Sequence, residues 1–151
     1  MKSIIALLAF VMAASGVYSQ KLKEADVPAP VAKEFHARFP KAKEVKWSKE
    51  SVSEFEAEFE VGDLEQSASF DAAGKWMGTE TEIKKAELPQ AVLATLAKDF
   101  AGYKIEEAEK AETDKGTFYE VEATKEKLKY EVQLSPDGKV IKKEEKEKDK
   151  D

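Results

Sequence analysis

The chain of 151 residues contains no cysteine, a single histidine, His36, and a single arginine, Arg38. Without cysteine, disulfides and thiol mechanisms are excluded, so an apolar core alone must hold the fold together. The sequence also lacks a Gly-x-Ser-x-Gly turn for a serine nucleophile, a zinc-ligand spacing and an EF-hand loop. We therefore predict no catalytic residue, no metal site and no cofactor.

The chain has fewer basic than acidic residues, with 25 Lys and Arg residues against 31 Asp and Glu residues and a formal net charge of -6. No basic cluster is interleaved with aromatic residues, as a nucleic-acid surface would require. After residue 20, no apolar run is long enough to span a bilayer. These absences argue against nucleic acid as a partner and against membrane insertion of the processed chain.

The first 19 residues have the layout of a secretory signal peptide. A short basic start precedes an apolar run at 4–14 and a small-residue exit at 15–19. We predict cleavage after Ser19 and export to the periplasm or the cell exterior. A buried N-terminal helix is the alternative interpretation. No cysteine follows the apolar run, so a lipid anchor is excluded.

Two segments, 27–40 and 88–102, have the apolar spacing of amphipathic helices. Each opens with an apolar residue followed by proline, which suits the first helical turn. Apolar residues then recur at i, i+4 and i+8: Val31, Phe35 and Phe39 in the first segment, and Val92, Leu96 and Phe100 in the second. Pro40 ends the first helix and Gly102 ends the second.

After each helix the apolar period changes to two, which is typical of antiparallel strands with one buried face. Between residues 54 and 61, four glutamates alternate with apolar residues. Hairpin turns are predicted at 71–75 and 135–139, each with a glycine that can adopt a positive φ. Segment 105–113, rich in Glu and Lys, gives the weakest strand signal.

The two halves of the chain repeat one pattern. The helices match at an offset of 61 residues and the strands at 64, so that Glu120 and Glu122 correspond to Glu56 and Glu58. We predict an α+β fold, a tandem repeat of helix plus antiparallel β-meander units forming one extended antiparallel sheet with helices packed on one face. The repeats span 20–86 and 87–145, and the charged residues 146–151 are predicted to be a disordered tail.

These features resemble the PepSY-like proteins of bacterial envelopes, which are also described as β-lactamase-inhibitor-like. The resemblance covers residues 26–145 and rests on four short motifs: the Val-Pro or Leu-Pro helix entry, Phe35-His36-Ala37-Arg38-Phe39-Pro40, Val45-Lys46-Trp47, and the Phe-x-x-x-Gly-Lys hairpin. It implies tandem helix-plus-sheet units within one larger sheet. It implies no catalytic residue, and no site residue carries over from it.

Three conspicuous side chains have a structural and a functional interpretation. His36 fits an exposed helix surface or a satisfied, partly buried imidazole better than a catalytic role. Trp47 and Trp76 have the strand parity of the apolar face, which favours core packing over a platform for a carbohydrate or a peptide. We therefore expect both tryptophans in the core.

One predicted sheet face, opposite the helices, is rich in carboxylates. It carries Glu54, Glu56, Glu58, Glu60, Glu120, Glu122 and Glu131, with Lys129 and Gln133 among them. Carboxylates on adjacent strands repel one another, and a cationic partner would relieve that repulsion. The alternative is a solvated face that keeps the protein soluble and discourages edge-to-edge pairing.

The sequence leaves three classes of function open. The first is a non-catalytic periplasmic or secreted module that binds a protein or peptide of the cell envelope through its sheet face. The second is an inhibitor or regulator of an envelope peptidase or another hydrolase. The third, an enzyme, lacks a recognisable nucleophile, base or metal ligand set. We favour the binding module.

Overall fold

The computed structural model describes residues 19–146. The predicted signal peptide up to residue 18 and the predicted tail beyond residue 146 lie outside this range. Within the described range the elements are β1 (Gln20–Leu22), a 3-10 helix (Glu24–Asp26), α1 (Ala29–Arg38), β2 (Lys43–Lys49), β3 (Glu54–Val61), β4 (Leu64–Asp71), β5 (Trp76–Glu82), a second 3-10 helix (Lys85–Glu87), α2 (Gln90–Asp99), β6 (Lys104–Thr113), β7 (Gly116–Lys125), β8 (Leu128–Leu134) and β9 (Val140–Lys146).

The nine strands form one antiparallel sheet in which strand order follows chain order from β1 to β9. The predicted combination of an antiparallel sheet with helices is therefore confirmed. By its contacts the chain divides into two compact units. The first runs to Val61 and includes Ser67–Met77, and the second comprises Gly62–Gln66 and the chain from Gly78 onward. Strands β4 and β5 thus contribute to both units, which are described separately below.

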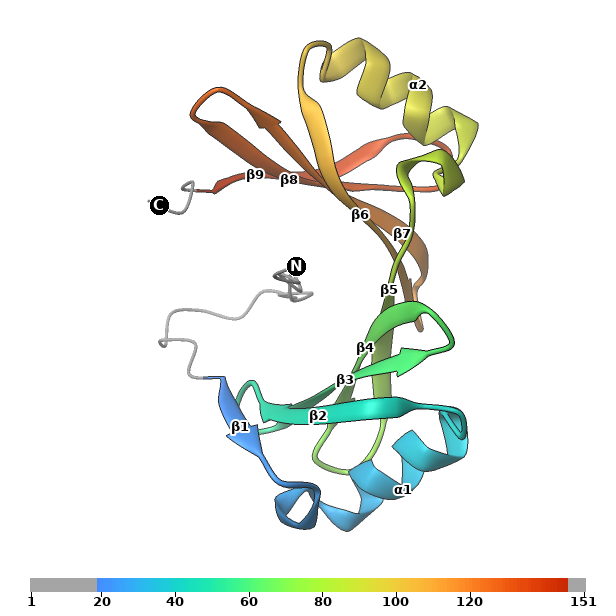
Figure 1. Ribbon diagram of the computed structural model, residues 1–151, viewed down its shortest axis with the longest axis vertical. Helices are drawn as coiled ribbons and strands as arrows, with labels where there is room; N and C mark the ends of the chain where they lie inside the picture. Colours follow the sequence, from blue (N-terminus) through green and yellow to red (C-terminus); the bar gives the residue numbers. More distant parts are fainter. Residues whose placement is uncertain (1–18, 147–151) are drawn as a thin grey trace. The chain divides into compact units, whose positions relative to one another are not determined.

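In the first unit, α1 packs on the face of the sheet formed by the apolar side chains of β2, β3 and β4 (Figure 1). The helix follows Pro28, its N-cap, and ends at Phe39, whose N–H donates to the Phe35 carbonyl. The Phe35 ring is fully buried and lies edge-on to Trp47 and Phe59, with ring centroids 5.0 and 5.1 Å apart. This aromatic contact joins the helix to the strands.

The second unit has a core of its own beneath α2 (Figure 1). The helix presents Val92 and Leu96 to the strands and ends at Phe100, whose N–H donates to the Leu96 carbonyl. Its buried core residues are Leu88, Val92, Leu96, Phe100, Ala108, Val121, Ala123, Val132 and Leu134. No residue of this core belongs to the core of the first unit.

In both units a hairpin glycine lies directly against the helix. Gly74 has a φ of 87°, and a Cβ added there would meet the Pro30 carbonyl oxygen at 2.6 Å. Gly138 has a φ of 83°, and a Cβ there would come even closer to the Ala91 carbonyl oxygen. Only glycine combines the left-handed backbone with so close an approach.

The structure adds to the sequence analysis and corrects it in places. Strand β1 and the two 3-10 helices were not predicted, since three residues are too few to show a period. Segment 105–113, the weakest strand signal, lies in β6. Lys146, which we assigned to the disordered tail, lies in β9. Trp47 is buried as predicted, but Trp76 is only half-buried and has the Arg38 guanidinium 4.5 Å above its ring.

Candidate functional site: the acidic sheet faces

Each unit has a sheet face that packs against its helix and a face that points away from it. Phe55, Ala57 and Phe59 of β3 are buried in the first core, and Val121 and Val132 are buried in the second. Because successive side chains of a strand alternate between faces, the intervening glutamates lie on the face opposite the helix. We call these surfaces the first acidic face and the second acidic face, one on each unit.

The first acidic face carries Glu54, Glu56, Glu58 and Glu60 of β3. Strand register places Ser48 of β2 opposite Glu56, Lys46 opposite Glu58 and Lys43 opposite Glu60. Glu58 and Glu60 are exposed, whereas Glu56 keeps only 4% of its surface accessible. Glu56 is therefore much less accessible than Glu58 and Glu60 on the same strand. Burial raises the pKa of Glu56 to about 8, with further contributions from the charges of Glu50, Glu58 and Glu54.

The second acidic face contains a row of polar side chains that crosses five strands. From β5 to β9, adjacent members of this row lie directly opposite one another: Glu82, Glu109, Glu120, Gln133 and Lys142. Burial raises the pKa of Glu109 to about 8, aided by nearby carboxylates of which Glu120 is the strongest. Burial also raises the pKa of Glu120 to about 7, opposed by a hydrogen bond from the Gln133 amide.

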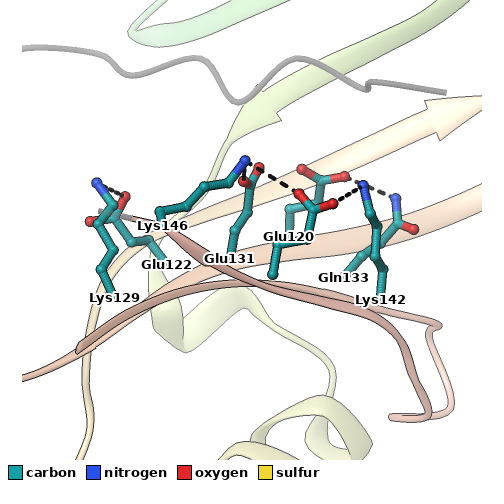
Figure 2. Close-up of polar contacts among 8 residues, drawn as sticks. Glu120, Glu122, Lys129, Glu131, Gln133, Lys142 and Lys146 are labelled. Carbon is teal, nitrogen blue, oxygen red and sulfur yellow. Dashed lines mark hydrogen bonds and ion pairs between the residues drawn. The ribbon is translucent and has the colours of Figure 1, made fainter. Parts of the chain in front are cut away.

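A second row lies two residues from the first along each strand and consists of four glutamates on adjacent strands: Glu107, Glu122, Glu131 and Glu144. Its charges are largely balanced within the chain. Lys129 Nζ lies 2.8 Å from Glu122 Oε2, and Lys146 Nζ lies 2.8 Å from Glu131 Oε2 (Figure 2). Lys129, Lys142 and Lys146 of this face come from β8 and β9, whereas β6 contributes Lys104, which lies opposite Thr124 and pairs with Glu106. The end of the face at β5–β7 therefore has fewer cations than the end at β8–β9.

Glu120 shows how a buried carboxyl at this position is accommodated. It is 8% exposed, and Gln133 Nε2 donates to its Oε1 at 2.9 Å (Figure 2). Lys142 and Lys146 stabilise its ionised form at longer range. A neighbouring amide and two lysines thus offset part of the cost of burying the charge.

Each residue predicted for the acidic face lies on the side of the sheet opposite the helix, as the alternation along its strand indicated. How deeply these side chains are buried, and which of them pair with one another, was not predicted. Sequence analysis also missed Glu82, Glu107 and Glu109 of β5–β6, and Lys142, Glu144 and Lys146 of β9. The i, i+2 spacing of the β6 glutamates was a usable signal. It was obscured by a register shift between Ile105 and Glu107, which breaks the alternation.

The remaining candidate residue is His36, which lies on α1. His36 is 55% exposed on the helix surface, as predicted, and its Nε2 lies 2.7 Å from Glu24 Oε1. Within residues 19–146, no group of three or more His, Cys, Asp or Glu side chains is placed to hold a metal ion. No helix in the same range is long and apolar enough to cross a membrane.

A family model matches the chain over residues 17–65 and again over residues 53–142. The family is described as "Putative beta-lactamase-inhibitor-like, PepSY-like". Among curated proteins, none matches the sequence of this chain.

Solved structures from Bacteroides species share the fold. A DUF2874 family protein from Bacteroides uniformis is 24% identical, with a TM-score of 0.73 over 78% of this chain and 88% of that one. A "putative periplasmic" protein from Bacteroides eggerthii is 18% identical, with a TM-score of 0.74 over 79% and 88%. A BLIP-like protein from Bacteroides fragilis is 21% identical, with a TM-score of 0.70 over 81% and 88%. At these identities the similarity shows the fold alone.

Proposed function

Because the chain belongs to the PepSY-like, β-lactamase-inhibitor-like family, we propose that it is a non-catalytic binding module of the bacterial envelope. It engages a cationic protein or peptide through its acidic sheet faces. A β-lactamase inhibitor acts by binding another protein, so the family description fits a module of this kind. The name of the Bacteroides eggerthii structure supports a periplasmic location.

The observation that carries this proposal is the excess of closely spaced carboxyls over cations. Glu56, Glu109 and Glu120 all have a pKa between about 7 and about 8 because they are buried beside other glutamates. Perturbed groups of this kind concentrate at functional sites. A cationic partner would favour their ionised forms and so gain binding energy that a neutral partner would not.

Inhibition of an envelope hydrolase is the second candidate function, and the family description favours it. It differs from plain binding in its effect on the partner. An inhibitor would slow hydrolysis by the captured enzyme in proportion to complex formation, whereas a scaffold would leave turnover unchanged.

We also infer that the two units are a tandem repeat. The 3-10 helices Glu24–Asp26 and Lys85–Glu87 and the N-cap prolines Pro28 and Pro89 are all separated by 61 residues. The hairpin glycines differ by 64 residues, and each lies against a helix residue whose position differs by 61. Equivalent contacts at the offsets seen in the sequence support duplication of a single ancestral unit.

Affinity capture from envelope extract of the native cell, with chemical cross-linking, tests the proposed function. We expect one dominant, salt-sensitive partner that is lost when Glu56, Glu58, Glu120 and Glu122 are all changed to Gln. A matched control changes Glu24, Glu44, Glu126 and Glu145 to Gln, which removes the same number of carboxyls from exposed positions elsewhere. Equal capture by both variants would contradict binding through the acidic faces.

A further inference from the structure

Glu56 is a carboxyl of the first unit that lies in the sheet without a hydrogen-bond or ion-pair partner among residues 19–146. It is more than nine-tenths buried on the first acidic face, with an accessible fraction of 4%. Within the described chain its carboxyl has no hydrogen bond or ion pair, and the charges that most affect it belong to Glu50, Glu58 and Glu54. The carboxyl oxygens keep a small contact with solvent, so a complementary group from outside can reach them, and a hydrogen bond to that group would offset part of the cost of the burial.

The second unit contains an internal comparison for this position. Glu120, which corresponds to Glu56 at the repeat offset of 64, receives a hydrogen bond from Gln133 and is stabilised by Lys142. At the same offset, the counterparts of Gln133 and Lys142 are Ser69 and Gly78. These residues supply neither an amide donor nor a positive charge. The first unit therefore lacks the two components that complete the Glu120 site.

We propose that Glu56 is the anchor for an arginine side chain of the protein partner, with Ser48 as a second acceptor for the guanidinium. This assignment rests on the proposed function and specifies the chemistry of the partner. A guanidinium combines the two components missing here, because it carries several hydrogen-bond donors and a permanent positive charge. Ser48 lies directly opposite Glu56, and its hydroxyl donates to Glu50 Oε1 at 2.5 Å, which leaves oxygen lone pairs free to accept.

The chain cannot supply this arginine itself. Its single arginine, Arg38, lies on α1, where it contacts the Trp76 ring and pairs with Glu34. Arginine suits the site better than lysine because a guanidinium is more weakly hydrated and matches a carboxylate in bidentate geometry. The occupant must therefore come from another molecule.

Binding at Glu56 depends on pH through several groups of the first unit. Charged or titratable side chains share this face of β1 to β4 by register and alternation: Lys21, Lys43, Lys46, Glu54, Glu58, Glu60, Glu65 and Asp71, with Glu50 beside them. Helix α1 packs on the opposite face. Since the pKa of free Glu56 is about 8, arginine binding below pH 8 releases a proton. Affinity should rise from pH 6 to pH 8 and then level off.

The test uses the mature protein, purified as the cell processes it, and a tetra-arginine peptide as probe. Tetra-citrulline, a neutral isostere, and tetra-lysine are the control peptides. Carbon-13 NMR of the glutamate carboxyls reports occupancy of Glu56, and calorimetry in two buffers counts released protons. We expect tetra-arginine to lower the pKa of Glu56, and Glu56→Gln to weaken its binding by about tenfold or more.

Two single variants control for charge and for position. Glu24→Gln removes a carboxyl from an exposed position of the first unit outside the acidic faces, and Glu126→Gln does so in the second unit. Both should change tetra-arginine affinity by less than about threefold. Equal losses in Glu56→Gln and Glu24→Gln, or equal affinity for tetra-lysine, would overturn the anchor. Thermal unfolding of Glu56→Gln checks its fold, and Ser48→Ala, with an expected loss specific to tetra-arginine, provides a second test.

Failure of the anchor can be told apart from failure of the proposed function. If the fourfold Gln variant loses its partner and Glu56→Gln keeps it, the anchor is wrong and the binding function stands. If tetra-arginine binds at Glu56 while capture finds no partner that depends on the acidic faces, the anchor stands and the binding function is wrong.

Discussion

At the scale of single residues, the carboxyl of Glu109 makes stability depend on pH. It lies half-buried opposite Glu120, without a hydrogen bond in the described chain, and its pKa is about 8. The folded state therefore holds a proton that the unfolded state releases near pH 4.5. Between these values the folded state binds more protons than the unfolded state, so stability falls as the pH rises from about 4.5 to about 8.

Glu109→Gln should flatten this dependence. At pH 5 the two side chains are both neutral and the variant should match the natural protein. At pH 8 the variant should be more stable by about 1–2 kcal/mol, a value reduced for partial exposure and for coupling to Glu120. Urea unfolding at several pH values measures the difference. Glu60→Gln, at an exposed position, is the control, and an identical pH profile for Glu109→Gln would contradict the account.

The sequence predicts on which face of the sheet such residues lie, but it does not predict how deeply they are buried. Alternation along β3 and β7 placed Glu56 and Glu120 opposite the core correctly. Their accessible fractions depend on side chains of neighbouring strands, and hence on register, which one strand does not encode. Gln133 stabilises Glu120 only because β7 and β8 pair in one particular register.

At the scale of elements, the close contact of each hairpin with its helix can be tested by adding a methyl group. Gly138→Ala places a Cβ against the Ala91 carbonyl and within 2.9 Å of Thr95 Oγ1, and also strains the backbone at a φ of 83°. The Thr95 hydroxyl donates to the Gly138 carbonyl at 2.6 Å, so a shift of the hairpin would weaken this bond too. We expect a loss of about 2 kcal/mol or more.

Gly62→Ala separates the steric contact from the backbone strain. Gly62 has a φ of 65°, and nothing lies within 4 Å of an added Cβ. Its replacement should cost only the left-handed backbone penalty, about 1 kcal/mol. Thermal or urea unfolding of both variants measures the difference, and equal losses would show that the approach of hairpin to helix contributes nothing to stability.

The elements themselves were predicted with unequal success for physical reasons. Both helices have an apolar stripe, a proline entry and a defined stop, and three such signals agree in the sequence. Strand β9 is mostly charged. It lies at the edge of the sheet, Lys146 pairs across to Glu131 of β8, and Glu144 pairs with Lys142 and Lys146 within the strand. Its charge pattern resembles that of a disordered tail, and only the pairing with β8 distinguishes the two.

At the scale of the whole molecule, the two separate cores allow one unit to be destabilised selectively. Phe35 is fully buried in the first core, where it contacts five aromatic rings, those of His36, Phe39, Trp47, Phe59 and Phe70. Phe35→Ala should cost about 3–5 kcal/mol of the stability of that core. The second core shares none of these residues and loses no contact directly.

The aromatic residues make this selective loss measurable. Both tryptophans, Trp47 and Trp76, belong to the first unit, so tryptophan fluorescence reports that unit alone, whereas far-UV circular dichroism reports both. In Phe35→Ala we expect the fluorescence midpoint in urea to fall well below the midpoint of the remaining circular dichroism change. Val92→Ala, in the second core, should leave the fluorescence midpoint in place and lower the other transition. Coincident shifts in both variants would instead mean that the continuous strands β4 and β5 make the molecule unfold as one cooperative body.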